Sequence, residues 1–228
     1  FQQSLERGLK AAEIAENISD LKGAVAGRYW ASLAARANGD AESLRLLASG
    51  ILEPAQQLRD RYWLSSAYQV NFSPPIFEGD WDTARTFSEL GLAQLPADPR
   101  QLVDRIFLES QAGFRVEADL YLRRLEEVVG TSAAVSNAAR ALMSISAGVA
   151  CEVFGPLERP DSAKAAISAV LSSPTAIPYF VMMARSGASL IAVSDGDVDT
   201  AREQYGYLFS CQGFFASSTS VDRVLGLL

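Results

Sequence analysis

A short phrase that combines glycine and aspartate recurs along the chain and constrains the fold more than any other feature. It reads EGDWDTAR at residues 78–85 and DGDVDTAR at 195–202, with a weaker copy, NGDAE, at 38–42. Glycine commonly ends a helix in the left-handed conformation, and the aspartate that follows caps the next helix and places negative charge at its positive end. The phrase therefore predicts a tight turn between two helices.

The spacing of the phrase indicates a repeat. Gly39 and Gly79 are 40 residues apart, and Gly196 follows after 117 residues, close to three such intervals. Two degenerate copies fill the gap, GFRVEA at 113–118 and RPDSA at 159–163. A period in this range is typical of stacked helical repeats.

Apolar residues follow each turn at helical spacing, and little of the chain alternates as a strand would. In the helix after Gly79, the small residues Ala84, Ser88 and Gly91 share one face, which would let a neighbouring helix approach closely. The first helix of each pair is expected at about 19–38, 58–72, 98–113, 133–154 and 175–195, with flanking helices at 2–17 and from Val221.

These patterns predict an all-α fold. We expect a right-handed superhelical stack of about five antiparallel helix pairs with partial helices at both ends, formed by residues 1–228 as a single domain. The chain begins at Phe1 and ends at Leu228 without a start or stop signal, so it reads as a piece of a longer multidomain protein.

Composition narrows the classes of function. The 228 residues are 49% hydrophobic and 21% charged, as in an ordinary globular protein. They include no histidine, the side chain most used for proton transfer and zinc binding near neutral pH. The net charge of −7 argues against direct nucleic-acid binding. We therefore expect no catalytic residue, no metal and no cofactor.

Two further features bear on location. Cys151 and Cys211 lie far apart, as expected of reduced thiols in a cytoplasmic protein. The charge-free stretch between Lys164 and Arg185 contains Pro174 and Pro178, which favours the end of one helix and the start of another over a membrane span.

The segment from Gly79 to Ala84, with Leu92 and Pro96 after it, resembles the second half of a tetratricopeptide repeat. The long pairs, the phrase RQL after Asp98 and Pro99, and the ending DRVLGLL are similar to the tetratricopeptide-like region of large bacterial regulators, a MalT-like arm. In such regulators this region is combined with a LuxR-type DNA-binding domain or a nucleotide cyclase domain. The resemblance implies a sensor or scaffold arm that binds an effector or partner.

An aromatic and basic cluster on the early first helices is the best candidate for recognition, because first helices line the concave surface of stacked pairs. Trp30 and Trp63 lie within this cluster and could instead be core. The candidate binding residues are Arg28, Tyr29, Arg61, Tyr62 and Tyr68.

Two other sequence features, the paired aspartates and a charge-free aromatic stretch, each have two possible interpretations. The paired aspartates Asp80 and Asp82, and Asp197 and Asp199, could bind a divalent cation, but their positions at helix starts favour capping. The aromatic stretch between Glu203 and Asp222 carries no charge and is either a partner patch or surface covered by a further helix pair.

Three hypotheses follow. The first is a non-catalytic module whose concave groove binds a protein segment, a peptide or a small effector. The second is an enzyme with an Asp, Glu or Tyr pocket inside the superhelix, which clustered carboxylates of raised pKa would support. The third is a spacer or dimerisation arm, which a large contact between copies would support.

Overall fold

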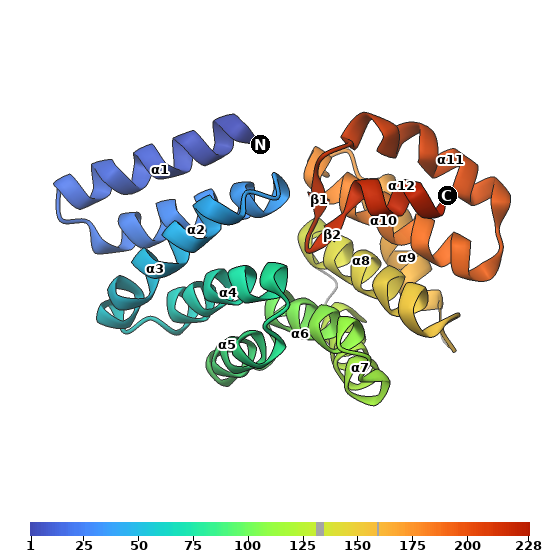
Figure 1. Cartoon of the computed structure of the whole chain (residues 1–228), viewed down its shortest axis with the longest axis horizontal. Helices are drawn as coiled ribbons and strands as arrows, with labels where there is room; N and C mark the ends of the chain where they lie inside the picture. The colour runs from blue at the N-terminus through green and yellow to red at the C-terminus, as the bar shows by residue number, and fades with distance from the viewer. Residues whose placement is uncertain (131–134, 159) are drawn as a thin grey trace. The chain divides into compact units, whose positions relative to one another are not determined.

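Helices connected by short turns account for nearly all of the computed structural model, which describes residues 1–130, 135–158 and 160–228 (Figure 1). A two-stranded hairpin and one turn of 3-10 helix at Phe209–Cys211 complete it. The all-α class is confirmed. The elements are α1 (Gln2–Asn17), α2 (Leu21–Ala37), α3 (Ala41–Leu58), α4 (Arg61–Glu78), α5 (Trp81–Gln94), α6 (Pro99–Gln111), α7 (Arg115–Gly130), α8 (Asn137–Phe154), α9 (Asp161–Leu171), α10 (Pro178–Asp195), α11 (Val198–Leu208), β1 (Phe215–Ala216), β2 (Thr219–Ser220) and α12 (Val221–Leu227).

The glycine and aspartate phrase forms the turn that the sequence predicts. Gly39, Gly79 and Gly196 have φ values of 65°, 76° and 71°, in the left-handed region. The carboxylates of Asp80 and Asp197 accept the backbone N–H of Thr83 and Thr200, at 3.1 and 3.0 Å. The capping interpretation of these aspartates is therefore confirmed, and the described residues contain no group of acidic or thiol side chains arranged to hold a metal.

The same turn also occurs without glycine. Ser19 and Arg59 have φ values of 59° and 53°, and the aspartates that follow them cap α2 and α4. A left-handed residue followed by a capping aspartate thus recurs every 20 residues, with caps at Asp20, Asp40, Asp60 and Asp80. Only the turns that contain glycine were predicted from the sequence.

The Asp40 cap gives a pH-dependent prediction. Asp40 accepts hydrogen bonds from the hydroxyl of Ser43 at 2.6 Å and from its backbone N–H at 3.0 Å, and these hold the pKa of Asp40 below its ordinary value of 3.8. We expect Asp40→Ala to lower the free energy of unfolding by about 1 kcal/mol at pH 7.

The sign of the pH dependence follows from the lowered pKa. The carboxylate stabilises the fold above its unfolded pKa, and this contribution is lost as the pH falls through the lower folded value. Urea unfolding at pH 7 and pH 3 should therefore show the gap between wild type and Asp40→Ala closing in acid. Asp40→Asn, which keeps an acceptor, is the control; a gap that widens in acid would contradict the capping account.

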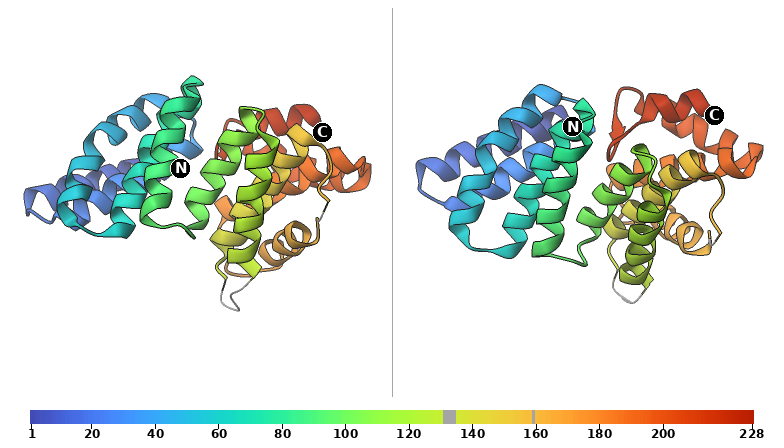
Figure 2. Two further views of the ribbon diagram at one scale, coloured as in Figure 1. Left: turned by 90° about the horizontal axis from the view of Figure 1, so that it is seen from below. Right: turned by 60° about the horizontal axis from the view of Figure 1, so that its bottom comes forward.

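The chain divides into two compact units, Phe1–Gln101 and Leu102–Leu228. In unit 1, α1 packs on α2, and each later helix packs on the one before it as far as α5, while α2 also contacts α4. Figure 2 shows α4 and α5 side by side in both views. The core of this unit includes Leu44, Ile51 and Val70.

The small face of α5 has the role that the sequence predicts. Ala84, Ser88 and Gly91 are fully or nearly fully buried. The neighbour that approaches is Gln101 in the first turn of α6, whose side-chain amide contacts Gly91 and donates to the backbone carbonyl of Ser65 at 2.7 Å. A larger residue at Gly91 would displace Gln101.

In unit 2, α8 and α10 form the central pair, with α9 against both and α11 and α12 against α10. Ile145, Met183 and Leu190 are among the residues of its core. Gly148 of α8 and Gly187 of α10 face one another, and a Cβ at Gly148 would lie 2.8 Å from the Cα of Gly187. The two helix backbones therefore touch at these glycines.

Most predicted helix positions are confirmed, but the helix predicted at 58–72 was expected to end too early, and prolines also lie inside helices of the structure. The helix predicted at 58–72 runs from Arg61 to Glu78 through Pro74 and Pro75, and α3 contains Pro54. A proline inside a helix leaves the carbonyl four residues earlier without its backbone donor. For Pro54 that carbonyl belongs to Gly50, and the guanidinium of Arg28 donates to it at 2.5 Å.

Two smaller departures lie in unit 2. Phe215 and Ala216 pair with Ser220 and Thr219 in a hairpin that the sequence reading did not foresee, because strands of two residues carry no alternation. Arg159, which opens the phrase at 159–163, and residues 133–134 of the helix predicted at 133–154 lie outside the described residues.

None of the helices in the described ranges combines the length and the apolarity that crossing a bilayer requires. The prediction that residues 1–228 form one continuous repeat domain stays a prediction.

Candidate functional site

The turns of unit 1 bring equivalent positions of successive helices onto one surface. Lys22 and Tyr62 each lie two residues after a capping aspartate, at the start of α2 and α4. Residues four apart share a helix face, so Ala26 and Trp30 continue the line of Lys22, and Ser66 continues that of Tyr62. We call this surface the α2–α4 face and define it by Lys22, Ala26, Trp30 and Tyr62, whereas Ser66 is buried.

Arg100 covers part of this face from the first turn of α6. Its Nη1 donates to the hydroxyl oxygens of Tyr29 at 2.9 Å and Ser66 at 3.0 Å. Its Nε and Nη2 form a two-pronged contact with the carboxylate of Asp98, at 3.0 and 2.5 Å. Such bidentate pairs are strong and hold the guanidinium in a fixed plane.

Burial and neighbouring charges both shift the pKa values of Arg100 and Tyr29. Burial alone would lower the pKa of Arg100, but its hydrogen bonds to Asp98 and Tyr29 raise the pKa above its ordinary value, so the guanidinium stays charged. Burial also raises the pKa of Tyr29, although Arg100 opposes that shift. Tyr29 is therefore a neutral phenol, and its hydroxyl donates to the side-chain oxygen of Gln69 at 3.2 Å.

Four aromatic rings interlock around the cluster. Trp30 meets Tyr29, Tyr29 meets Trp63, and Trp63 meets Tyr62, each edge to face, with centroids 5.4, 6.3 and 5.1 Å apart. The guanidinium of Arg100 lies 4.6 Å from the centre of the Tyr62 ring. Edge-to-face and cation–π contacts of this kind favour fixed ring positions.

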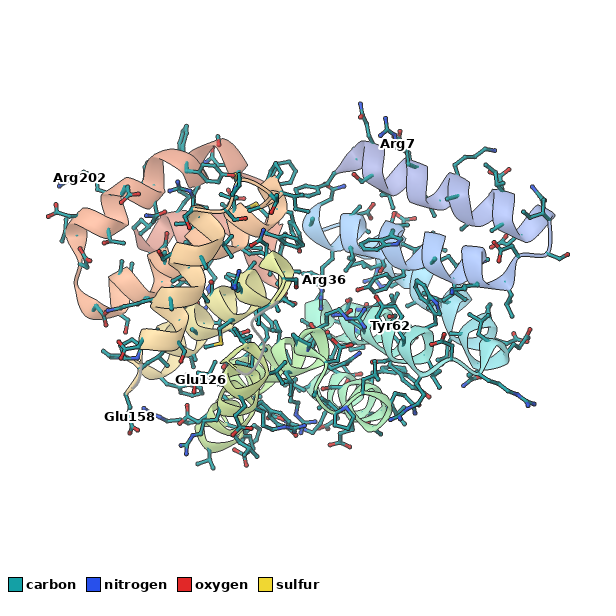
Figure 3. All side chains as sticks on the ribbon, turned by 180° about the vertical axis from the view of Figure 1, so that it is seen from behind. Arg7, Arg36, Tyr62, Glu126, Glu158 and Arg202 are labelled. Atoms are coloured by element: carbon teal, nitrogen blue, oxygen red, sulfur yellow. The ribbon has the colours of Figure 1, made fainter. Side chains whose placement is uncertain are left out.

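The two ends of this series are open to solvent. The exposed fractions of Trp30 and Tyr62 are 59% and 44%, whereas that of Tyr29 is 2%. Tyr62, labelled in Figure 3, projects from the first turn of α4. Beside it lies an open hollow of about 480 Å³, lined by the segment Leu95–Asp98 together with Arg61, Tyr62 and Arg100.

The structure distributes the five predicted binding residues between surface and interior. Tyr62 is on the surface, as is Arg61, whose guanidinium donates to the carbonyl of Gln94 at the end of α5. Arg28 is half-buried, bound to Glu16 at 2.7 Å and to Gly50. Tyr29 and Tyr68 are buried and therefore do not form the surface; Tyr29 lies beneath it, where it contacts Trp30 and Arg100.

Arg100 and Asp98 hold the site together, but they were not among the binding residues predicted from the sequence. They follow Pro96 in a connecting segment, and their contacts with α2 and α4 are 34 or more residues away in the chain. A signal was present, because Asp98 and Arg100 repeat the spacing of Asp60 to Tyr62 after a turn. The question of Trp30 and Trp63 is also answered: Trp30 is exposed and Trp63 is half-buried.

The remaining candidates lie in unit 2. Tyr205 and Phe209 of the charge-free stretch stack at 5.9 Å on the surface of unit 2. An open hollow of about 400 Å³ beside them has mainly apolar walls that include Val193, Val198 and Leu227. Both cysteines are free thiols, and burial raises the pKa of Cys151 to about 11, far from nucleophilic at neutral pH.

The fold and the site together define the class of protein. It is an all-α protein whose helices are joined by short turns, and unit 1 carries exposed aromatic side chains on the α2–α4 face. No family model, curated protein or solved structure matches the chain.

Proposed function

We propose that the chain is a non-catalytic module that binds a protein or peptide segment on the α2–α4 face. The observation that carries the proposal is the pair of exposed aromatics, Trp30 and Tyr62, held by contacts with the rings of Tyr29 and Trp63 and by a fixed Arg100. Tryptophan, tyrosine and arginine dominate the binding energy of protein interfaces. Exposed rings that are already fixed lose little conformational entropy when a partner binds.

The regular turns support a tetratricopeptide-like superhelical stack as the finer architecture. Each helix of unit 1 from α2 to α5 begins at a capping aspartate, and α2 contacts both its pair partner α3 and the equivalent helix α4. Contact between equivalent helices of successive pairs is what a stacked repeat requires. On this proposal the chain is the interaction arm of a cytoplasmic bacterial transcriptional or cyclase-type regulator.

The chemistry of the hollow favours binding over proton transfer. Its carboxylate, Asp98, is committed to Arg100, and the nearby phenol of Tyr29 has a raised pKa. A general acid or base works best with a pKa near the operating pH. The groups next to Tyr62 are therefore better suited to shape recognition and hydrogen bonding.

Selection from a random dodecapeptide library on the whole 228-residue chain tests the proposal. We expect selected peptides to bind wild type and to lose about tenfold or more in affinity with the double variant Trp30→Ala and Tyr62→Ala. Trp81→Phe on α5, outside the α2–α4 face, is the matched control and should bind as wild type does.

Urea unfolding of the same variants separates binding from folding. The double variant should lose about 2–3 kcal/mol and still unfold in one cooperative transition, because each side chain is only partly exposed and gives up an aromatic contact. Peptides that bind the double variant as well as wild type would show that recognition lies elsewhere.

A further inference from the structure

The hollow beside Tyr62 carries a positive charge that no carboxylate matches. Its charged lining residues are Arg61, Asp98 and Arg100. Asp98 and Arg100 form a neutral pair, because Nε and Nη2 of Arg100 both bind the Asp98 carboxylate. Arg61 is exposed, and within the part of the chain that the structure describes its guanidinium contacts no carboxylate and donates to the backbone carbonyl of Gln94.

The carboxylate of Asp60, which precedes Arg61 in the sequence, is engaged in capping. Its Oδ1 accepts the backbone N–H groups of Tyr62 at 2.8 Å and Trp63 at 3.3 Å, so it lies at the N-terminus of α4. The positive end of a helix compensates a negative charge placed there. The walls of the hollow come from other residues, and two arginines with one aspartate give its lining a net formal charge of +1.

The rest of the hollow is mainly apolar. Leu95, Pro96 and Ala97 form one part of its wall, and Tyr62 forms another. The hydroxyl of Tyr62 accepts from Nη1 of Arg100 at 3.4 Å, so its own proton is available to an acceptor on a ligand. A guanidinium binds carboxylates more strongly than neutral acceptors. The complementary ligand therefore presents a carboxylate next to an apolar side chain.

We propose that the hollow beside Tyr62 binds an acidic segment of a partner protein, in which a glutamate or aspartate pairs with Arg61 and a neighbouring apolar side chain packs on Leu95. This inference rests on the proposed peptide-binding function and names the class of peptide. It places the charged contact in the hollow itself, where Arg61 and Tyr62 line the same space.

Titration of the whole 228-residue chain into fluorescein-labelled GELEGELEGE, followed by fluorescence anisotropy, tests the inference. The comparison peptides replace glutamate by glutamine, glutamate by lysine, or leucine by glycine. At about 150 mM salt, charges further apart than about 8 Å are largely screened, so the net charge of −7 of the chain has little influence. We expect saturable binding of the acidic peptide and at least fivefold weaker binding of each comparison peptide.

Substitutions at Arg61 show whether the preference comes from the hollow. Arg61→Gln removes the charge and should weaken binding of the acidic peptide about fivefold, without changing binding of the glutamine peptide. Arg61→Lys keeps the charge and should restore most of the affinity. Arg7→Gln is the matched control, because Arg7, labelled in Figure 3, is an exposed arginine on α1, outside the hollow. It should bind all four peptides as wild type does.

The outcomes separate the inference from the proposed function. A glutamine or lysine peptide that binds as well as the acidic one, or an acidic peptide that binds Arg61→Gln and wild type equally, would overturn the inference. If library peptides without acidic residues nevertheless bind and depend on Trp30 and Tyr62, the peptide-binding function stands without it. Failure of both the acidic peptide and the library would overturn both.

Discussion

Gly187→Ala should lower the free energy of unfolding by about 3 kcal/mol, although alanine is the better helix former. A Cβ at Gly187 would overlap the backbone carbonyl of Ser144 in α8, which cannot move aside as a flexible side chain can. The contact of α8 with α10 is the centre of unit 2, so the two helices would have to separate. Urea unfolding monitored by far-ultraviolet circular dichroism measures the loss.

Gly206→Ala is the matched control. Gly206 also lies inside a helix, α11, but it is exposed and a Cβ there meets nothing within 4 Å. This substitution should raise the free energy of unfolding by about 0.5–1 kcal/mol, because alanine favours the helix more than glycine does and its Cβ meets no neighbouring atom. Equal effects of the two substitutions would contradict the close approach of α8 and α10.

Arg100→Met should strongly destabilise unit 1. It removes the guanidinium from Asp98, whose carboxylate is only 8% exposed, and leaves that charge without its counter-ion. Breaking a buried pair from one side costs about 3–5 kcal/mol, mainly from the buried charge that remains. The free energy of urea unfolding at pH 7 measures this cost.

The double variant Asp98→Asn with Arg100→Met shows whether the cost is electrostatic. Asparagine keeps an acceptor for the backbone N–H of Arg100, which Asp98 accepts at 3.0 Å, but carries no charge. We expect the double variant to recover a large part of the loss. A double variant as unstable as Arg100→Met would assign the role of Arg100 to packing alone.

The local turn chemistry made the helices of this chain predictable. Gly79 followed by Asp80 specifies a left-handed helix end and a cap using two adjacent residues, so no distant contact is needed. Pro54 shows the opposite case: whether a proline ends a helix depends on a donor elsewhere, here Arg28 on another helix. Sequence spacing does not show that compensation.

The candidate site was predictable only at its surface. Tyr62 and Arg61 could be singled out from residue type, but Tyr29 and Tyr68 carry the same signal and are buried. Burial depends on which helices pack together, and Arg100 reaches Tyr29 across 71 residues of sequence. Residue type therefore indicated the region of the candidate site, and tertiary contacts determined which of its residues are buried and which are exposed.

The indole N–H resonances of the three tryptophans give the most direct test of the central claim, that the α2–α4 face is the recognition surface. On titration with a library-selected peptide, the account predicts a large shift for Trp30, a smaller one for Trp63 and none for Trp81 on α5. A bound peptide that leaves Trp30 and Trp63 unshifted would contradict it.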